Sequence, residues 1–124
     1  MDSAATDYLN EPESFSVNEK QRLDDIAQQL NHHKNHSRYN ELKAMLTNSR
    51  FLFVHTRDFL KIISQFDGVD LAVRNSTILP QQVMLCATMR NNLNTNFRHL
   101  LYFYNEQIQE LQNVINELPT SSKD

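Results

Sequence analysis

The sequence predicts an all-α fold, an antiparallel hairpin of two long helices with an additional N-terminal helix, together forming an elongated, coiled-coil-like bundle. Three observations predict it. The 124 residues include one glycine and three prolines, too few for the turns of a typical sheet protein. Apolar residues recur at helical spacing along two long stretches, and all three prolines lie outside the long periodic stretches. The length fits a single domain, which we place at residues 16–118.

The N-terminal segment, residues 1–15, is predicted to be a disordered acidic tail. Four of the fifteen acidic residues fall in it, without a lysine or arginine among its first fourteen positions. A first helix is expected at about residues 17–31, because Ser16 and Glu19 have the spacing of a capping box. Its apolar face consists of Leu23, Ile26, Ala27 and Leu30.

Residues 31–38 contain no apolar side chain, so the helical pattern is interrupted there. We expect a break or kink, with Ser37 available to cap the next helix. A continuous helix with one solvated turn is the alternative that the sequence leaves open.

The second helix, at about residues 37–66, has the clearest pattern in the chain. One row of positions alternates at three and four residues, which is a heptad seam. The seam consists of Tyr39, Leu42, Leu46, Ser49, Phe53, Thr56, Leu60 and Ile63. Asp67-Gly68 is expected to end this helix, because glycine is favoured just past a helix C-terminus.

The third helix, at about residues 80–118, is predicted to begin at Pro80, since proline suits the first turn. The apolar connection at residues 69–79 is expected to form a helical turn, and residues 119–124 a polar tail. Folding the two long helices about a centre near residue 73 places Thr56 opposite Arg90 and Ser49 opposite Phe97. Ser49, Thr56 and Arg90 are therefore predicted to set the register.

A second apolar row runs beside the seam and makes the apolar stripe wider than one partner helix covers. This row consists of Met45, Leu52, Phe59 and Phe66. Leu101 and Phe103 add a further patch, because they point away from the Leu100/Tyr104 seam. These six residues are the predicted partner-binding surface.

No catalytic site, cofactor site or metal site is predicted from the sequence. His32 and His36 lie one helical turn apart, but no further cysteine or well-placed carboxylate completes a zinc site. The single Cys86 excludes an intramolecular disulfide, and we expect it to be a small buried hydrophobe. The basic residues are scattered, which argues against direct nucleic-acid binding.

We therefore expect a non-enzymatic scaffold or interaction subunit of a multi-subunit helical complex, with other helical subunits as partners. A self-assembling homo-oligomer is the first alternative, and a membrane-trafficking adaptor the second, although the basic helix flank of such an adaptor is missing. No apolar run approaches the length that spans a bilayer, and the N-terminus lacks the apolar core of a signal peptide. The expected location is intracellular, in the nucleus or the cytoplasm.

Overall fold

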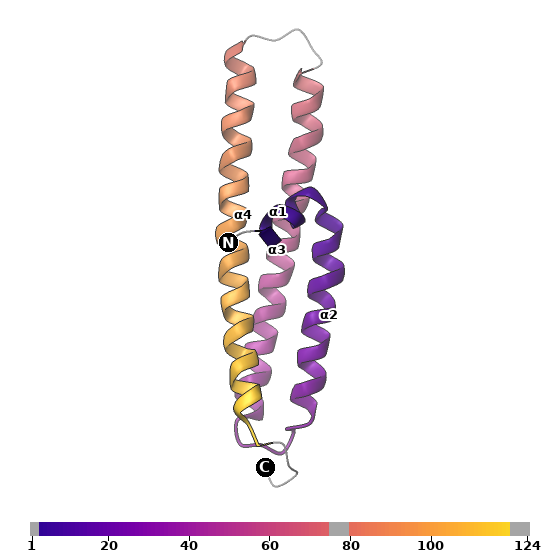
Figure 1. Cartoon of the computed structure of the whole chain (residues 1–124), viewed down its shortest axis with the longest axis vertical. Coiled ribbons are helices and arrows are strands. Elements are labelled where there is room, and N and C mark those ends of the chain that lie inside the picture. Colours follow the sequence, from indigo (N-terminus) through magenta and orange to yellow (C-terminus); the bar gives the residue numbers. More distant parts are fainter. Residues whose placement is uncertain (1–2, 75–79, 120–124) are drawn as a thin grey trace.

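The computed structural model describes residues 3–74 and 80–119. These residues form four α-helices, α1 (Ser3–Asn10), α2 (Pro12–Asn31), α3 (Tyr39–Arg74) and α4 (Pro80–Glu117), and contain no β-strand. Figure 1 shows α3 and α4 side by side and running in opposite directions. Helix α2 lies along the half that is remote from the α3–α4 connection, and α1 crosses in front where α2 begins. The all-α helical bundle expected from the sequence is confirmed.

Helix α1 corrects the prediction of a disordered N-terminal tail. Ala5 and Tyr8 are buried, so this short helix contributes to the common core. The Tyr8 ring meets the Phe15 ring edge-on, with their centroids 5.1 Å apart. An acidic composition lowers the tendency of a segment to fold alone, but it gives no information about the contacts that the segment makes with the rest of the chain.

Helix α2 begins at Pro12, five residues before the predicted start. Proline at the first helical position costs no hydrogen bond, because that amide has no partner within the helix. Ser16 therefore lies inside the helix, and the predicted capping box with Glu19 does not form. The Ser14 hydroxyl instead donates a hydrogen bond to the Glu11 carbonyl at 2.7 Å.

The interruption at residues 31–38 is confirmed as a break. Helix α2 ends at Asn31, and turns lead to α3 at Tyr39. The His36 backbone amide donates to the His33 carbonyl at 3.0 Å, and the Tyr39 amide donates to the His36 carbonyl at 3.0 Å. The chain reverses direction here, which places α2 beside α3 (Figure 1).

Helix α3 does not end at Asp67-Gly68 but continues to Arg74. One glycine inside a helix costs only about 1 kcal/mol, and residues 71, 72 and 74 are leucine, alanine and arginine, which favour helix. Residues 69–74 of the predicted connection between the two long helices therefore belong to α3. Residues 75–79, the rest of it, lie outside the described residues, as do residues 120–124 of the predicted C-terminal tail.

The start of α4 at Pro80 is as predicted, but the register between α3 and α4 is not. Because α3 runs on to Arg74, the connection is centred near residue 77 rather than 73. Arg90 accordingly pairs with Asp67 and not with the Thr56 layer. Asp67 is eleven residues beyond Thr56, which corresponds to roughly 16 Å along the helix.

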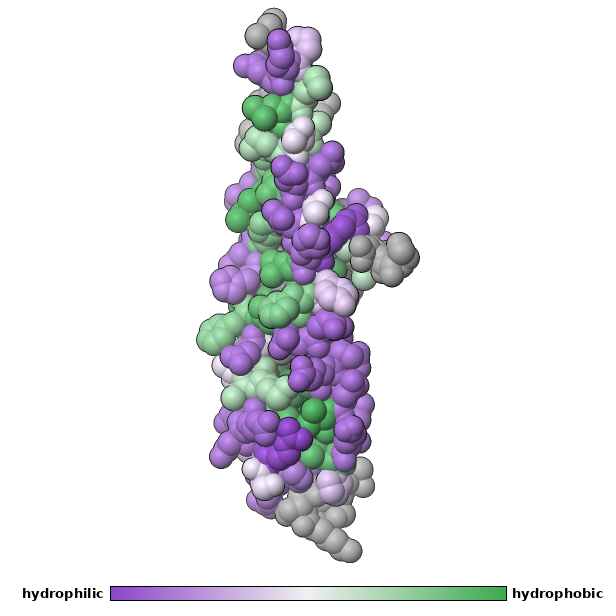
Figure 2. All heavy atoms as spheres, turned by 90° about the vertical axis from the view of Figure 1, so that its left-hand side faces the viewer, coloured by the Kyte–Doolittle hydropathy of each residue, from purple (hydrophilic) through white to green (hydrophobic). Residues whose placement is uncertain are grey.

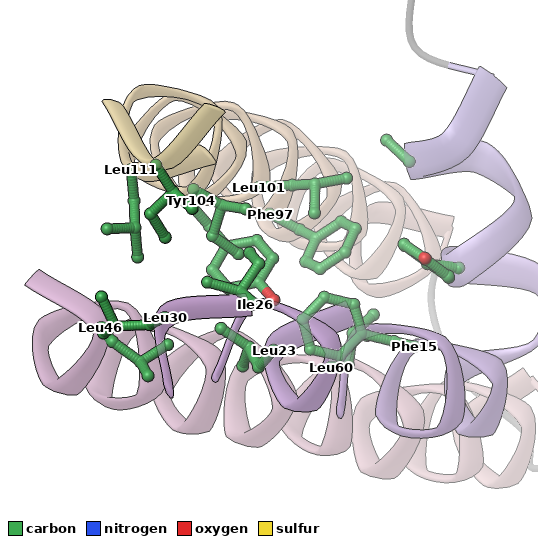
Figure 3. Packing of buried hydrophobic residues seen from close by; sticks show 14 of the residues in the cluster. Phe15, Leu23, Ile26, Leu30, Leu46, Leu60, Phe97, Leu101, Tyr104 and Leu111 are labelled. Atoms are coloured by element: carbon green, nitrogen blue, oxygen red, sulfur yellow. The ribbon is translucent and has the colours of Figure 1, made fainter. Parts of the chain in front are cut away.

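The core lies where α1, α2, α3 and α4 come together. Figure 3 shows side chains from α2, α3 and α4 converging between the helices. The largest fully buried side chains include Tyr104, Phe15, Phe97, Leu23, Ile26 and Leu30. The Phe15 ring stacks on Phe53 at 5.5 Å between centroids, and it also contacts Tyr104 at 5.8 Å.

Candidate functional site

The heptad seam of α3 faces the interior, as the sequence predicts. Six of its eight positions are buried, and Tyr39 and Phe53 are half-buried. Both polar seam residues are among the buried ones: Ser49, and Thr56, whose hydroxyl donates to the Leu52 carbonyl at 2.7 Å. This intrahelical bond satisfies the Thr56 hydroxyl without a partner on α4. Arg90 is half-buried, pairs with Asp67 and also donates to the Asn94 side chain at 3.3 Å, so it does not share the predicted layer with Thr56.

The second apolar row of α3 is half-buried rather than free. Met45, Leu52 and Phe59 pack against the core, and Phe66 is also half-buried. The chain's own helices therefore cover much of the surface that the sequence analysis assigned to a partner.

Leu101 is not part of an exposed patch, which corrects its assignment to a partner surface. Its side chain is 4% exposed, whereas Phe103 is 50% exposed. The buried positions of α4 follow a faultless four-and-three spacing that includes Leu101 and omits Leu100. They are Phe97, Leu101, Tyr104, Ile108, Leu111 and Ile115, and the buried Leu118 just after the helix continues the spacing. The α4 residues that hydrogen-bond to α1 and α2 lie nearer to Leu101 than to Leu100 around the helix, so the inward face includes Leu101.

Five exposed apolar side chains line the opposite side of the α3–α4 pair, and we call them the back stripe. They are Phe51 and Ile62 of α3 and Leu85, Met89 and Phe103 of α4. Phe103 is the one residue among them that belongs to the predicted partner-binding surface. The run of four apolar residues at 51–54 was the available signal, because such a run surrounds a helix and one end of it must face outward.

The position of the back stripe follows from the helical geometry of about 100° per residue. On α3, Arg50 and Phe53 contact α2, and Phe51 and Ile62 lie roughly 140° around the helix from them.

Helix α4 has the same arrangement. Arg98, Asn105 and Gln112 contact α1 or α2, and the stripe residues of α4 lie roughly 170° away. Figure 2, which views the molecule from the α4 side, shows hydrophobic patches along this surface among hydrophilic side chains.

Most positions next to the back stripe are uncharged, although the exposed Asp58 lies on the same face of α3, one turn before Ile62. The helical positions beside it carry Asn48 and His55 on α3 and Asn92 and Asn96 on α4, and all four are exposed. Neutral polar neighbours keep water at the rim of an apolar surface without selecting a charge on the partner. The stripe is therefore suited to a partner helix with an apolar face.

A buried carboxylate on α2 holds three helices together. Glu19 is 7% exposed, and it accepts a hydrogen bond from the Tyr8 hydroxyl of α1 at 2.6 Å and from the Tyr104 hydroxyl of α4 at 3.0 Å. The Arg22 guanidinium donates to Glu19 at 3.2 Å and to the Asn105 side chain at 2.9 Å. A buried charge with several donors is stabilised, so we read this Glu19 cluster as a structural clamp.

The two tyrosines of the Glu19 cluster resist ionisation. Burial, followed by the hydrogen bond to Glu19 and its charge, raises the pKa of Tyr8 to about 12. Burial and the charge of Glu19 also raise the pKa of Tyr104 strongly. Both hydroxyls therefore remain protonated donors, and Glu19 remains the acceptor.

The side chains that could bind a metal ion or act as a nucleophile do not gather at one site in the described part of the chain. Within residues 3–74 and 80–119, no three histidine, cysteine, aspartate or glutamate side chains are grouped as metal ligands. His33 is buried, and the Nδ1 atom of His36 accepts a hydrogen bond from the Arg38 amide at 3.0 Å. Cys86 is half-buried in α4, although the sequence analysis expected it to be buried. None of the described helices combines the length and apolar character needed to cross a lipid bilayer.

Comparison with known proteins adds no functional assignment. The chain matches no family model, and no curated protein or solved structure is detectably similar to it. Function is therefore inferred from the surfaces described above.

Proposed function

We propose that this chain is a non-enzymatic interaction subunit of a larger helical assembly, in which a helix of another subunit packs onto the back stripe. The α3–α4 pair would act as an antiparallel hairpin that extends its coiled-coil-like packing to the partner. The observation that carries the proposal is the alignment of five large apolar side chains on one side of two adjacent helices.

The back-stripe residues expose much of their apolar surface to water. Phe51 is 63% exposed, and the other four stripe residues are between 45% and 59% exposed. Complete burial of one such side chain contributes roughly 1.5–3 kcal/mol, so covering the remaining exposed area of all five would favour association. Exposed apolar patches of this kind in monomers are a frequent mark of interaction surfaces.

The partner expected here is a helix with a continuous apolar face and neutral or weakly charged flanks. A row of leucine or phenylalanine residues at three-and-four spacing on the partner helix would pack between α3 and α4 along the back stripe. We favour a different subunit as the partner, and association with a second copy is the alternative outcome of the test below.

The test compares two double variants of the tagged chain in cells of its source. Phe51→Asp with Phe103→Asp places charges in the back stripe. Val17→Asp with Tyr102→Asp places the same charges on two equally exposed residues outside it, which are 70% and 67% exposed. We expect the stripe variant to lose at least about tenfold of a co-purifying protein, as for a hot-spot change, while the control retains it.

Quantitative mass spectrometry of the purified complexes gives the readout, and circular dichroism verifies that both variants fold. Equal retention of all partners by the two variants would refute the proposal. A stable dimer of the purified chain that only the stripe variant dissociates would assign the surface to self-association instead.

A further inference from the structure

A groove between α2 and α3, on a different side from the back stripe, has a distinct chemistry. Two hollows of about 450 Å³ and 670 Å³ share Ser16 and Arg57 as lining residues, so they join into one continuous depression. The smaller hollow lies between α2 and the middle of α3, and the larger lies where α2 begins and α3 continues beyond it. We call this depression the α2–α3 groove.

The floor of the α2–α3 groove is apolar. Leu23 of α2 and Phe53 and Val54 of α3 line the smaller hollow, and Leu60 lines the larger one. Leu23 and Leu60 are buried, Phe53 is half-buried and Val54 is exposed, so the apolar surface is graded from the interior to the solvent. The apolar surface that a bound helix could still cover therefore comes mainly from Phe53 and Val54.

The rim of the groove is basic along α3 and at Lys20, whereas Glu11 and Glu13 line the end near the start of α2. Arg50, Arg57 and Lys61 of α3 line it, and Lys20 of α2 lines it from the other side. The three α3 positions are separated by seven and four residues, which places them on one side of the helix. Their span of eleven residues corresponds to roughly 16 Å, or about three helical turns.

The ion pairs already present on the rim leave its cations available. Arg50 approaches Asp24 only to 3.7 Å, and Arg57 pairs with the adjacent Asp58 at 3.1 Å. All four of these side chains are between 35% and 53% exposed, and exposed ion pairs contribute little to stability. The Arg57 guanidinium also lies 5.9 Å from the centroid of the Phe53 ring, which keeps it close to the groove floor.

We propose that the α2–α3 groove binds an acidic amphipathic helix of about three turns. Its apolar face would pack on Phe53 and Val54, above the buried Leu23, and its carboxylates would pair with Arg50, Arg57 and Lys61. Glu11 and Glu13 line the end of the groove near the start of α2, and they would exclude a carboxylate there. The acidic residues of the partner are therefore expected along the α3 rim and not at that end.

This proposal is independent of the function proposed for the back stripe, because the two surfaces share no residue. The apolar floor and the basic rim together favour a protein helix over nucleic acid. Nucleic acid would bind to the basic side chains through its phosphates and would leave the apolar floor without a contact. They also favour it over an anionic membrane, since the apolar residues lie in a depression rather than on a convex face.

The test uses a dye-labelled synthetic peptide of about 14 residues, the length of a helix spanning the groove, with leucine on one face and glutamate on its flanks. We expect saturable binding to the full chain, which weakens as salt is added. Amide chemical shifts should change mainly near Arg50, Val54 and Arg57. A peptide with lysine in place of glutamate is expected to bind at least about tenfold more weakly.

Two variants with the same change in net charge separate the groove from general charge effects. Arg50→Glu with Arg57→Glu is expected to weaken binding of the acidic peptide by at least about tenfold. Lys34→Glu with Arg38→Glu, which alters two exposed residues in the turns before α3, should weaken it by less than about twofold. The Phe51→Asp, Phe103→Asp variant should bind the peptide as the parent chain does.

Several results would overturn the proposal. These are no binding of the acidic peptide at millimolar concentration, equal binding of the lysine peptide, or shift changes that map to the back stripe. A preference for duplex DNA or for phosphatidylserine vesicles over the peptide would also overturn it, and would assign the basic rim to that ligand.

Discussion

The two halves of α4 differ sharply in how they are packed. Among residues 97–117, six are buried, namely Phe97, Leu101, Tyr104, Ile108, Leu111 and Ile115. Among residues 80–96, none is buried, although Val83, Cys86 and Leu93 are half-buried. Helix α2 is the difference, because it lies beside the first group and stops short of the second (Figure 1).

This difference indicates where the stability of the chain is concentrated, whereas the back stripe runs along both halves, with Phe51 and Phe103 in the half that α2 covers. Two helices bury only the line where they touch, whereas a third helix closes the space between them into a core. The three-helix half, together with α1, therefore supplies most of the stability. The two-helix half retains apolar residues such as Ile62, Leu85 and Met89 that another polypeptide can cover.

The largest predicted effect comes from deleting an aromatic ring in the three-helix half. Phe15 is fully buried and contacts the rings of Tyr8, Phe53 and Tyr104. Phe15→Ala is expected to lower the free energy of unfolding by about 3–5 kcal/mol, through lost burial and the cavity left behind.

Met89→Ala provides the contrasting change in the two-helix half, because Met89 is 45% exposed. We expect it to cost about 1 kcal/mol or less. Urea denaturation of both variants gives the comparison, and similar losses for the two would contradict the division into halves.

A smaller effect is predicted for the Glu19 cluster. Glu19→Gln removes the charge and one of the two carboxylate oxygens that accept from Tyr8 and Tyr104. A buried donor that loses its acceptor costs roughly 1–3 kcal/mol, so we expect a loss of that order. Glu106→Gln changes an exposed carboxylate on α4 and should leave the free energy of unfolding nearly unchanged. An equal response of the two variants would show that the cluster does not clamp the helices.

The smallest predicted effect is a dependence on alkaline pH. Because the pKa of Tyr8 is raised from 10.0 to about 12, its contribution to stability is complete below pH 10. That contribution falls as the pH rises above 10 and is lost as the pH passes through about 12.

Tyr8→Phe should therefore reduce the loss of stability between about pH 9 and about pH 11, measured by urea denaturation at each pH. Tyr102→Phe, which changes an exposed tyrosine, is the control. An unchanged pH dependence in the Tyr8 variant would contradict the role given to its hydroxyl.

The sequence predicted those features that depend on local pattern. The heptad seam of α3, the break at residues 31–38 and the start of α4 at Pro80 follow from spacing, missing apolar residues and proline geometry. Each of these signals lies within a few turns of the element that it describes.

The features that depend on contacts between distant residues were not predictable in this way. Helix α1 is held by Tyr8 against Phe15 and Glu19, and no periodicity in eight residues reveals those contacts. The end of α3 was placed too early because one glycine is a weak stop signal, and the register error followed from it. Leu101 was wrongly assigned to the partner-binding surface, because residue spacing alone does not show on which side of α4 the helix α2 packs.

Amide hydrogen exchange of the purified chain, at a concentration where its mass is that of a monomer, tests the division of α4 most directly. We expect amides of residues 80–96 to exchange at least about tenfold faster than those of residues 97–117, because fewer buried contacts oppose local opening. Uniform protection along the whole of α4 in the monomer would contradict the account, since the two-helix half would then be complete without another polypeptide.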